Sequence, residues 1–402
     1  MQAPIEELRN FVDKNRQEML SLWETLVNMQ GYSREFEKIE QVLDFLRTKL
    51  ESEGIACHYL DSKGGVPVLV AELNKDVPGK PVLLCGHCDT VFPSDSFPEN
   101  PFYIDEEGFA HGPGVHDMKD GIAQIVYIMA ALKRLGYTER PVKAVIVGDE
   151  EIAHAYGITD ELLMQEAKGS LCAFNMESGR LDNCLTVGRK GGMDCHITVH
   201  GVAAHAGNDY MKGRNAIIEM SRKLPLLQDL SIFDEGLTVS VGVIKGGMVS
   251  NAVPDYCYAE LDVRYKKLEH MDYIKEKIRE VCAQTYIEGT TTEVEFVAPM
   301  PAFEETQANH DLLAYVNSVA TKLGYEAMQP VYVGGMSDAA YFGSVGVPTL
   351  CSMGAMGSGA HTREEKALVS SFYERWLIVM ACIMEVQTFA DKYAKYLNQR
   401  GV

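Results

Sequence analysis

Histidines and carboxylates recur where an apolar, strand-like run ends or a glycine-rich turn begins. These residues are His87 with Asp89, Asp117, the run Asp149-Glu150-Glu151, Glu177 and the late His361. Several carboxylates that are buried together without a cation are strongly destabilising, so their convergence predicts a metal site. Imidazole and carboxylate groups are ligands that zinc prefers, and two histidines with three carboxylates could hold a pair of ions that share one carboxylate.

The charge balance of such a site suits hydrolysis. Two divalent cations carry more charge than three carboxylates neutralise, so the site would acidify water toward a pKa of about 7 and polarise a carbonyl. Glu150 and Glu151 are neighbours, and successive side chains at a strand end point in different directions. One of the two can therefore bind metal while the other carries a proton.

The elements that must position these residues are short apolar strands separated by helices. The strand-like runs cover 66–73, 81–89, 143–150 and 170–177, a helix is predicted over 120–135, and two amphipathic helices are predicted in the first fifty residues. Continuous hydrophobicity indicates strands that are buried on both faces, as in a mainly parallel sheet covered by helices. In such α/β domains, ligands bind outside the carboxyl ends of the strands.

From about Gly188 the pattern changes to alternating strands and two helices in the order β-α-β-β-α-β, which is typical of a small α+β domain. After 299 the earlier rhythm returns, with a helix over 311–323, a strand over 347–354 and a long terminal helix from about Glu364. Because His361 falls in this last part, the sequence predicts a discontinuous catalytic domain of 1–187 and 300–402 with 188–299 inserted.

Composition narrows the classes of partner and location. The 402 residues carry a formal net charge of -20, which argues against a nucleic-acid partner. The longest apolar runs, 125–132 and 376–384, are far shorter than the roughly 20 residues of a membrane span. Ten irregularly spaced cysteines and an N-terminus without a signal-like pattern predict a cytoplasmic protein. Cys85 and Cys88 form a C-x-x-C motif, but residues three apart on a strand face opposite sides. They are therefore expected to be small buried residues and not a redox or zinc pair.

Ten motifs in order make the chain similar to the zinc-dependent exopeptidase family that includes glutamate carboxypeptidase, aminoacylase and succinyl-diaminopimelate desuccinylase. The motifs are GHCDT (86–90), GPGVHDMKDG (112–121), GDEE (148–151), NMES (175–178), GVAAHAG (201–207), GRNAI (213–217), NAVPD (251–255), ELDVR (260–264), GGMSDA (334–339) and GAHTREE (359–365). The resemblance covers nearly the whole chain.

The resemblance implies a specific set of metal ligands. His87, Asp117 and Glu177 would bind one zinc ion, and Asp117, Glu151 and His361 would bind the other, with cobalt or manganese also compatible with these donors.

The resemblance also assigns the residues around the metals. Glu150 would be the general base and acid, and Asp89 would orient the His87 ring. The Asp117-Met118 peptide bond is a candidate for the cis form.

The inserted segment resembles the lid and dimerisation domain of the family. By that resemblance, His205 reaches the active site of a partner subunit in a homodimer and stabilises the oxyanion. Arg264 and Asn251 would hold the carboxylate and backbone of the substrate, since an arginine grips a carboxylate with two hydrogen bonds. Lys190 and Arg214 are further candidates for the same pocket.

Two departures from the family pattern lie close to the expected site. Asp120 stands where the family usually has a glycine, and Ile152-Ala153-His154 follows the paired glutamates where glycine and serine are common. On a helix, Glu151 and His154 could chelate metal, although a structural role for His154 is favoured. The histidines at 58, 196, 200, 270 and 310 are expected to be solvated or core residues without acidic partners.

The sequence thus predicts a dizinc hydrolase that cleaves an amide or peptide bond next to a free carboxylate, most like a glutamate carboxypeptidase. The first alternative is a deacylase of N-acyl amino acids or succinyl-diamines with the same metal centre. The second is a non-catalytic binding protein on this scaffold. The expected partners are a small peptide or N-acyl amino acid and a second copy of the chain.

Overall fold

The chain forms two compact units, and the computed structural model describes residues 2–400. The first unit comprises the residues up to Gly188, Glu305–Val333 and the residues from Ser337 onward. The second comprises Arg189–Glu304 and Gly334–Met336. No helix within residues 2–400 combines the length and the apolar character that a membrane crossing needs.

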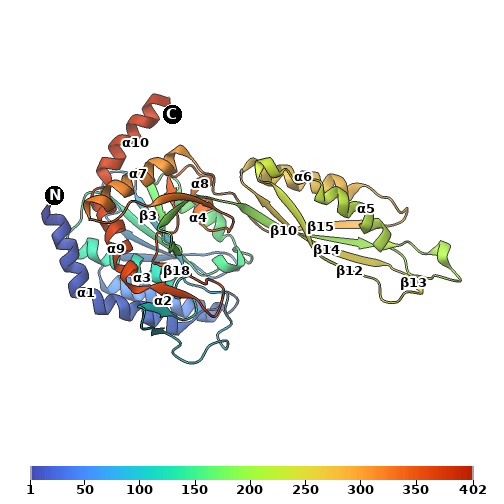
Figure 1. Cartoon of the computed structure of the whole chain (residues 1–402), viewed down its shortest axis with the longest axis horizontal. Coiled ribbons are helices and arrows are strands. Elements are labelled where there is room, and N and C mark those ends of the chain that lie inside the picture. The colour runs from blue at the N-terminus through green and yellow to red at the C-terminus, as the bar shows by residue number, and fades with distance from the viewer. Residues whose placement is uncertain (1, 401–402) are drawn as a thin grey trace. The chain divides into compact units, whose positions relative to one another are not determined.

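Figure 1 shows the first unit as helices around a central sheet. This sheet has six strands, and the three pairings nearest the predicted site are parallel. In sheet order the strands are β1 (Ala56–Leu60), β2 (Val68–Leu73), β6 (Val142–Val147), β3 (Val82–His87), β7 (Cys172–Asn175) and β17 (Thr349–Leu350). The β1–β2 and β2–β6 pairings are antiparallel. The predicted α/β class with a mainly parallel sheet is confirmed.

Helices cover both faces of this sheet. The helices of the unit are α1 (Gln2–Met29), α2 (Phe36–Ser52), α3 (Lys119–Arg134), α4 (Thr159–Ala167), α7 (Gln307–Lys322), α8 (Ala339–Ser344), α9 (Val369–Met384) and α10 (Val386–Arg400). Val82 and Leu84 of β3 belong to one large apolar core with α1, α2, α3, α7 and α9. Leu83 and Cys85 point the other way and are equally buried, and α4 and α8 contact strands β6, β7 and β17. Burial on both faces explains why these strands lack hydrophobic alternation.

A second sheet of short strands completes the first unit. Its order is β4 (Tyr103–Ile104), β5 (Phe109–His111), β19 (Lys366–Leu368), β18 (Met356–Ser358) and β8 (Gly179–Arg180). Strand β9 (Cys184–Arg189) pairs separately with β16 (Gln329–Val333).

The prediction of one long terminal helix from Glu364 is wrong. Residues 366–368 form strand β19, helix α9 begins at Val369, and it ends at Met384 before α10. The two or three residues of such strands are too few to show a hydrophobic period.

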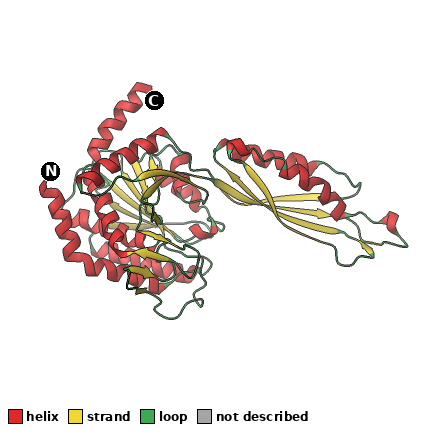
Figure 2. Cartoon of the chain, viewed as in Figure 1, coloured by secondary structure: helices red, strands yellow, loops and turns green. Residues whose placement is uncertain are grey.

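The second unit is a four-stranded antiparallel sheet with two helices on one face. The strands, in sheet order, are β12 (Thr238–Gly246), β14 (Tyr256–Tyr265), β10 (Gly191–His200) and β15 (Thr291–Met300), and the helices are α5 (Ala216–Gln228) and α6 (Glu269–Ala283). Figure 2 shows the two helices lying along this sheet. Alternate residues of β14, such as Leu261 and Val263, pack under α5 and α6 in a separate core. The predicted β-α-β-β-α-β order is confirmed, and a small pair, β11 (Ala204–His205) and β13 (Ala252–Val253), adjoins it.

All ten cysteines are free thiols. Cys85 and Cys88 are fully buried, as the sequence predicts.

Candidate metal centre

The ends of three adjacent parallel strands bring the first candidate ligands together. His87 is the last residue of β3, Glu150 and Glu151 form the 3₁₀ turn η1 (Glu150–Ile152) after β6, and Glu177 follows β7. Strands β6, β3 and β7 are neighbours in the sheet and run in the same direction. Their carboxyl ends therefore meet at one edge, where ligands bind in α/β sheets.

The second sheet positions the remaining ligands. Strand β5 leads into the loop with Asp117, which precedes α3, and His361 lies in the turn between β18 and β19. Strand β8 begins directly after Ser178 and pairs with β18, so the Glu177 segment is held by both sheets. All five predicted ligands belong to the first unit.

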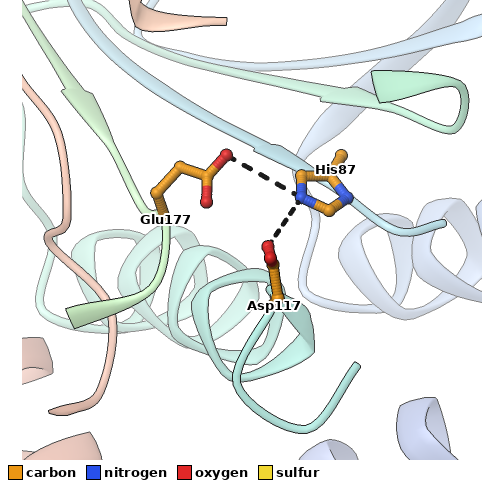
Figure 3. Close-up of side chains that lie close together, drawn as sticks. All are labelled: His87, Asp117 and Glu177. Atoms are coloured by element: carbon orange, nitrogen blue, oxygen red, sulfur yellow. Dashed lines mark hydrogen bonds and ion pairs between the residues drawn. The ribbon is translucent and has the colours of Figure 1, made fainter. Parts of the chain in front are cut away.

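His87, Asp117 and Glu177 form the first group (Figure 3). Nε2 of His87 lies 3.2 Å from Oδ1 of Asp117 and 3.8 Å from Oε1 of Glu177. Figure 3 shows both carboxylates pointing at the imidazole from different segments.

Asp117, Glu151 and His361 form the second group. Nε2 of His361 lies 3.0 Å from Oε2 of Glu151 and 3.4 Å from Oδ2 of Asp117. One oxygen of Asp117 thus faces His87 and the other faces His361. A carboxylate in this position can serve two sites at once.

The donor set fits a pair of divalent transition-metal ions. In each group, one donor atom from each residue lies within 4.8 Å of the others. Each group offers one imidazole nitrogen and carboxylate oxygens, the ligands that catalytic zinc sites use together with an open position.

The electrostatics of the cluster also favour cations. Hydrogen bonds with Asp117 and Glu151 raise the pKa of His361 to about 11. Burial alone would lower the pKa of His87, but hydrogen bonds with Asp117 and Asp89 raise it well above its usual value. The carboxylates therefore attract positive charge to both rings, and metal ions would take the place of those protons.

Asp89 links the His87 ring to the turn with the paired glutamates. Its Oδ1 lies 3.3 Å from Nδ1 of His87, and its carboxylate accepts the backbone N–H groups of Glu150 (3.3 Å) and Glu151 (3.1 Å). Burial would raise the pKa of Asp89, but hydrogen bonds from His87 and Ser33 lower it. An ionised Asp89 can thus orient the ring from the side opposite to the metal-facing nitrogen.

Glu150 lies beside both groups without belonging to either. Its Oε2 is 4.0 Å from Nε2 of His87. Burial raises the pKa of Glu150 well above its usual value, and the charges of Glu177 and Glu151 act in the same direction. Cations held by those two carboxylates would lower it again. A carboxyl group whose pKa is raised by burial and lowered by nearby cations can accept and return a proton.

Glu365 closes the motif GAHTREE, and its role is not evident from the sequence. It is 2% exposed and accepts backbone N–H groups of Gly114 (3.0 Å), His116 (2.8 Å) and Asp117 (2.9 Å). This one carboxylate joins the His361 turn to the Asp117 loop. A glutamate four residues after a ligand histidine was the available signal.

The Asp117 loop and the start of α3 have three further features. The Asp117-Met118 peptide bond is cis, as expected. A Cβ atom on Gly121 would lie 1.9 Å from the carbonyl oxygen of Met176, so only glycine lets α3 approach the Glu177 segment this closely. Asp120 is fully buried, accepts the amide N–H of Ala355 and belongs to neither metal group. Burial raises its pKa well above the usual value.

Within the described residues, His154 belongs to neither metal group. Its ring lies between Asp149 and Asp338, so the E-x-x-H chelate considered from the sequence does not form.

The expectation that the remaining histidines lack acidic partners is wrong for four of them. His196, His200, His270 and His310 lie within 4 Å of Glu295, Glu293, Glu235 and Glu305, respectively. His196 on β10 lies directly opposite Glu295 on β15, whereas His200 and Glu293 are diagonal neighbours on the same two strands. This register cannot be read from the sequence.

The predicted residues His205, Asn251 and Arg264 lie in the second unit. His205 is exposed on β11, and its Nδ1 accepts the N–H groups of Gly207 (3.1 Å) and Asn208 (3.2 Å). A neutral imidazole therefore carries its proton on Nε2 and can donate from that atom. The carbonyl of Asn251 accepts the N–H of Ala206, so Asn251 and His205 are held near one another.

Arg264 is engaged by a neighbour on its own strand. Nε and Nη2 donate to the Asp262 carboxylate at 2.9 Å and 2.7 Å. Asp262 and Arg264 are two residues apart on β14 and so share a face.

Comparison with known proteins defines the family. The profile of peptidase family M20/M25/M40 matches residues 83–385, which include all five candidate ligands. The chain belongs to this family. As an M20/M25/M40 member it is a hydrolytic enzyme of the metallopeptidase or amidohydrolase type, and the alternative of a non-catalytic binding protein is not retained.

Individual M20 relatives are similar over most of the chain. Carboxypeptidase G2 of Pseudomonas sp. (strain RS-16) is 28% identical over 371 residues, which cover 90% of this chain and 88% of that protein. Succinyl-diaminopimelate desuccinylase of Paracoccus denitrificans is 31% identical over 255 residues, 59% of this chain and 65% of the relative. The crystal structure of aminopeptidase PepT from Bacillus cereus shares the fold, with a TM-score of 0.75, 22% identity and coverage of 93% of this chain and 99% of that one.

Proposed function

We propose that the protein is a dizinc hydrolase that cleaves an amide or peptide bond next to a free carboxylate. The observation that carries this proposal is the orientation of Asp117, whose two oxygens face His87 and His361 from one carboxyl group. The similarity to a carboxypeptidase over 90% of the chain supports the substrate class.

The proposed roles follow from the position of each side chain. His87, Asp117 and Glu177 would hold one cation, and Asp117, Glu151 and His361 the other. When bound, the two cations supply the Lewis acidity that polarises the scissile carbonyl and lowers the pKa of the attacking water. Zinc suits these donors, and cobalt or manganese can use the same nitrogen and oxygen ligands.

Glu150 would move the proton. It takes a proton from the water as the oxygen attacks the carbonyl carbon, and it returns that proton to the nitrogen of the leaving amine as the C–N bond breaks. The products are a carboxylic acid and an amine. Asp89 keeps the His87 ring and the amides of Glu150 and Glu151 in place throughout.

Residues of the second unit would bind the substrate. Arg264 and Asn251 are proposed to hold its carboxylate and backbone, and the Nε2 proton of His205 to stabilise the oxyanion. Asp262 engages Nε and Nη2 of Arg264, so a substrate carboxylate would meet the Nη1 side of the guanidinium.

A deacylase is the second candidate function. The 31% identity with a succinyl-diaminopimelate desuccinylase favours it, and such an enzyme would use the same ligands and the same base on an N-acyl substrate.

Metal removal and a substrate panel test the proposal together. Gently purified protein is expected to contain about two zinc ions per chain, to lose hydrolysis on dialysis against a chelator, and to regain it with zinc or cobalt. The panel should contain dipeptides, γ-glutamyl compounds, N-acetyl amino acids and N-succinyl diamines.

The matched control in the panel is one dipeptide as the free acid and as the C-terminal amide. The free acid should be cleaved about 100-fold faster, because the amide leaves the arginine without its anionic partner. Equal rates on the two forms would contradict the substrate class, and faster cleavage of the N-succinyl compounds would favour the deacylase.

We further propose that the second unit forms a homodimer through the surface around β11 and β13. Met211 and Met248, on the segments that flank these strands, are 85% and 96% exposed. Large exposed apolar side chains that gather in one region are typical of a protein interface. His205 lies on this surface and could act in the active site of the partner.

Mixing two inactive variants tests whether His205 acts across the dimer. His205→Ala and Glu150→Gln dimers should each be inactive, and subunit exchange should restore about a quarter of the parent activity, since one site in each mixed dimer is complete. If mass analysis detects mixed dimers but hydrolysis is not restored, His205 acts within its own chain. A fully active monomer would contradict the dimer itself.

A further inference from the structure

His154, three residues after the paired glutamates, forms a buried bridge between two carboxylates. The residue is 4% exposed, and both ring nitrogens are engaged. Nδ1 lies 2.8 Å from Oδ1 of Asp149, and Nε2 lies 2.8 Å from Oδ1 of Asp338. Asp149 and Asp338 are 1% and 2% exposed, so the whole arrangement is excluded from water.

The two carboxyl groups that face the ring nitrogens favour an imidazolium at the centre of the bridge. Only a protonated ring can donate from both nitrogens. Burial opposes protonation, but the charges of Asp338 and Asp149 and their hydrogen bonds raise the pKa of His154 well above its usual value. Hydrogen bonds between ionised groups are shorter and stronger than neutral ones.

The near end of the bridge supports the turn that presents Glu150 and Glu151. Asp149 immediately precedes this turn, and its carbonyl accepts the N–H of His154 at 2.9 Å. Ala153 and His154 both have positive φ angles, 49° and 55°, a conformation that favours glycine. The six residues after Glu150 contain no glycine, so the turn needs support from outside its own backbone.

The far end of the bridge joins a different ligand-bearing segment. Asp338 is the N-cap residue of α8, which contacts β7, the strand that leads to Glu177. Asp149 also accepts the hydroxyl of Thr159 at the start of α4, and α4 and α8 contact each other. The bridge therefore connects the Glu150-Glu151 turn with the support of the Glu177 strand.

We propose that His154 is a positioning residue that fixes the Glu150-Glu151 turn relative to Glu177 by holding Asp149 and Asp338 together. The inference rests on the proposed metal centre and deepens it: His154 would contact neither metal nor substrate, and would set the geometry of one ligand and of the base.

The test uses His154→Asn in the full-length protein. Asparagine tolerates positive φ angles but is too short to reach both carboxylates. Because this variant leaves two buried carboxylates without their cation, the double variant His154→Asn/Asp338→Asn is measured beside it, together with Asp338→Asn. His310→Asn is the matched control, since His310 forms a 2.7 Å hydrogen bond with Glu305 in the same unit and is one-third exposed.

Zinc affinity, measured by chelator competition without substrate, is expected to fall about 10- to 100-fold in His154→Asn, as for other groups that orient metal ligands. With saturating zinc, kcat should fall by about the same factor while KM stays within about twofold. The visible spectrum of the cobalt-loaded variant should differ from that of the parent. The double variant should lose no more than His154→Asn, because both changes break one bridge, and His310→Asn should match the parent.

Parental zinc affinity in folded His154→Asn or in the double variant would overturn the proposal. Additive losses from the two single changes would overturn it as well, because His154 would then act without Asp338. Failure of both variants to fold would make His154 a residue of general stability and would also count against it. The zinc measurement needs no substrate, so it decides the role of His154 even if the parent protein does not hydrolyse the panel.

Discussion

Asp117→Asn is expected to lower hydrolysis by about three orders of magnitude or more and to remove bound zinc. The two carboxylate oxygens of Asp117 face His87 and His361, so the amide weakens both proposed sites at once. A metal centre contributes several kcal/mol to the transition state, and about 1.4 kcal/mol corresponds to a tenfold change in rate. Metal content by atomic emission and kcat/KM on the best panel substrate are the measurements.

The matched control for this prediction is Asp105→Asn. Asp105 also accepts from a histidine, with His111 Nε2 at 2.8 Å, but it is more exposed and belongs to neither metal group. This variant should keep parental zinc and activity. Two tightly bound zinc ions in Asp117→Asn would contradict the shared carboxylate.

Glu150→Gln is expected to lower kcat by about 10² to 10⁴ while zinc content stays unchanged. Glutamine has the shape of glutamate but cannot accept and return the proton. Glu150 lies 4.0 Å from His87 without belonging to a metal group, so its loss should affect the chemical step rather than metal loading. Single-turnover kinetics on zinc-saturated protein would separate the two effects.

The neighbouring residue provides the comparison for Glu150. Glu151→Gln makes the same chemical change one position later, at a side chain 3.0 Å from His361, and it should lower zinc affinity as well as activity. Parental hydrolysis by zinc-loaded Glu150→Gln would rule out its role as base. Zinc loss in that variant would instead make Glu150 a ligand.

The parts of this site that the sequence predicts are those attached to long apolar strands. Runs such as 82–87 are buried on both faces, and their hydrophobicity marks where each strand ends and where His87 must lie. Parallel pairing then brings Glu151 and Glu177 to the same edge without further information. Glycine-rich turns mark Asp117 and His361 as candidates, but the grouping of the ligands around each ion and the choice of Glu150 as the base come from resemblance to a family.

The parts that the sequence does not predict depend on contacts between distant segments. Strands β5, β8, β18 and β19 have two or three residues each, too few for a periodic signal, although they hold the Asp117 and His361 segments. The three hydrogen bonds that the Glu365 carboxylate accepts from backbone N–H groups join residues about 250 positions apart. The His154 bridge spans 184 positions and could not be inferred from local pattern.

Every candidate ligand resides in the first unit, whereas His205, Asn251 and Arg264 reside in the second. This arrangement separates two kinds of evolutionary change. Under the proposed function, replacements in the second unit would alter which compounds are accepted without changing the metal ligands. One ancestral hydrolase could thus give rise to enzymes with different substrates and the same metal centre.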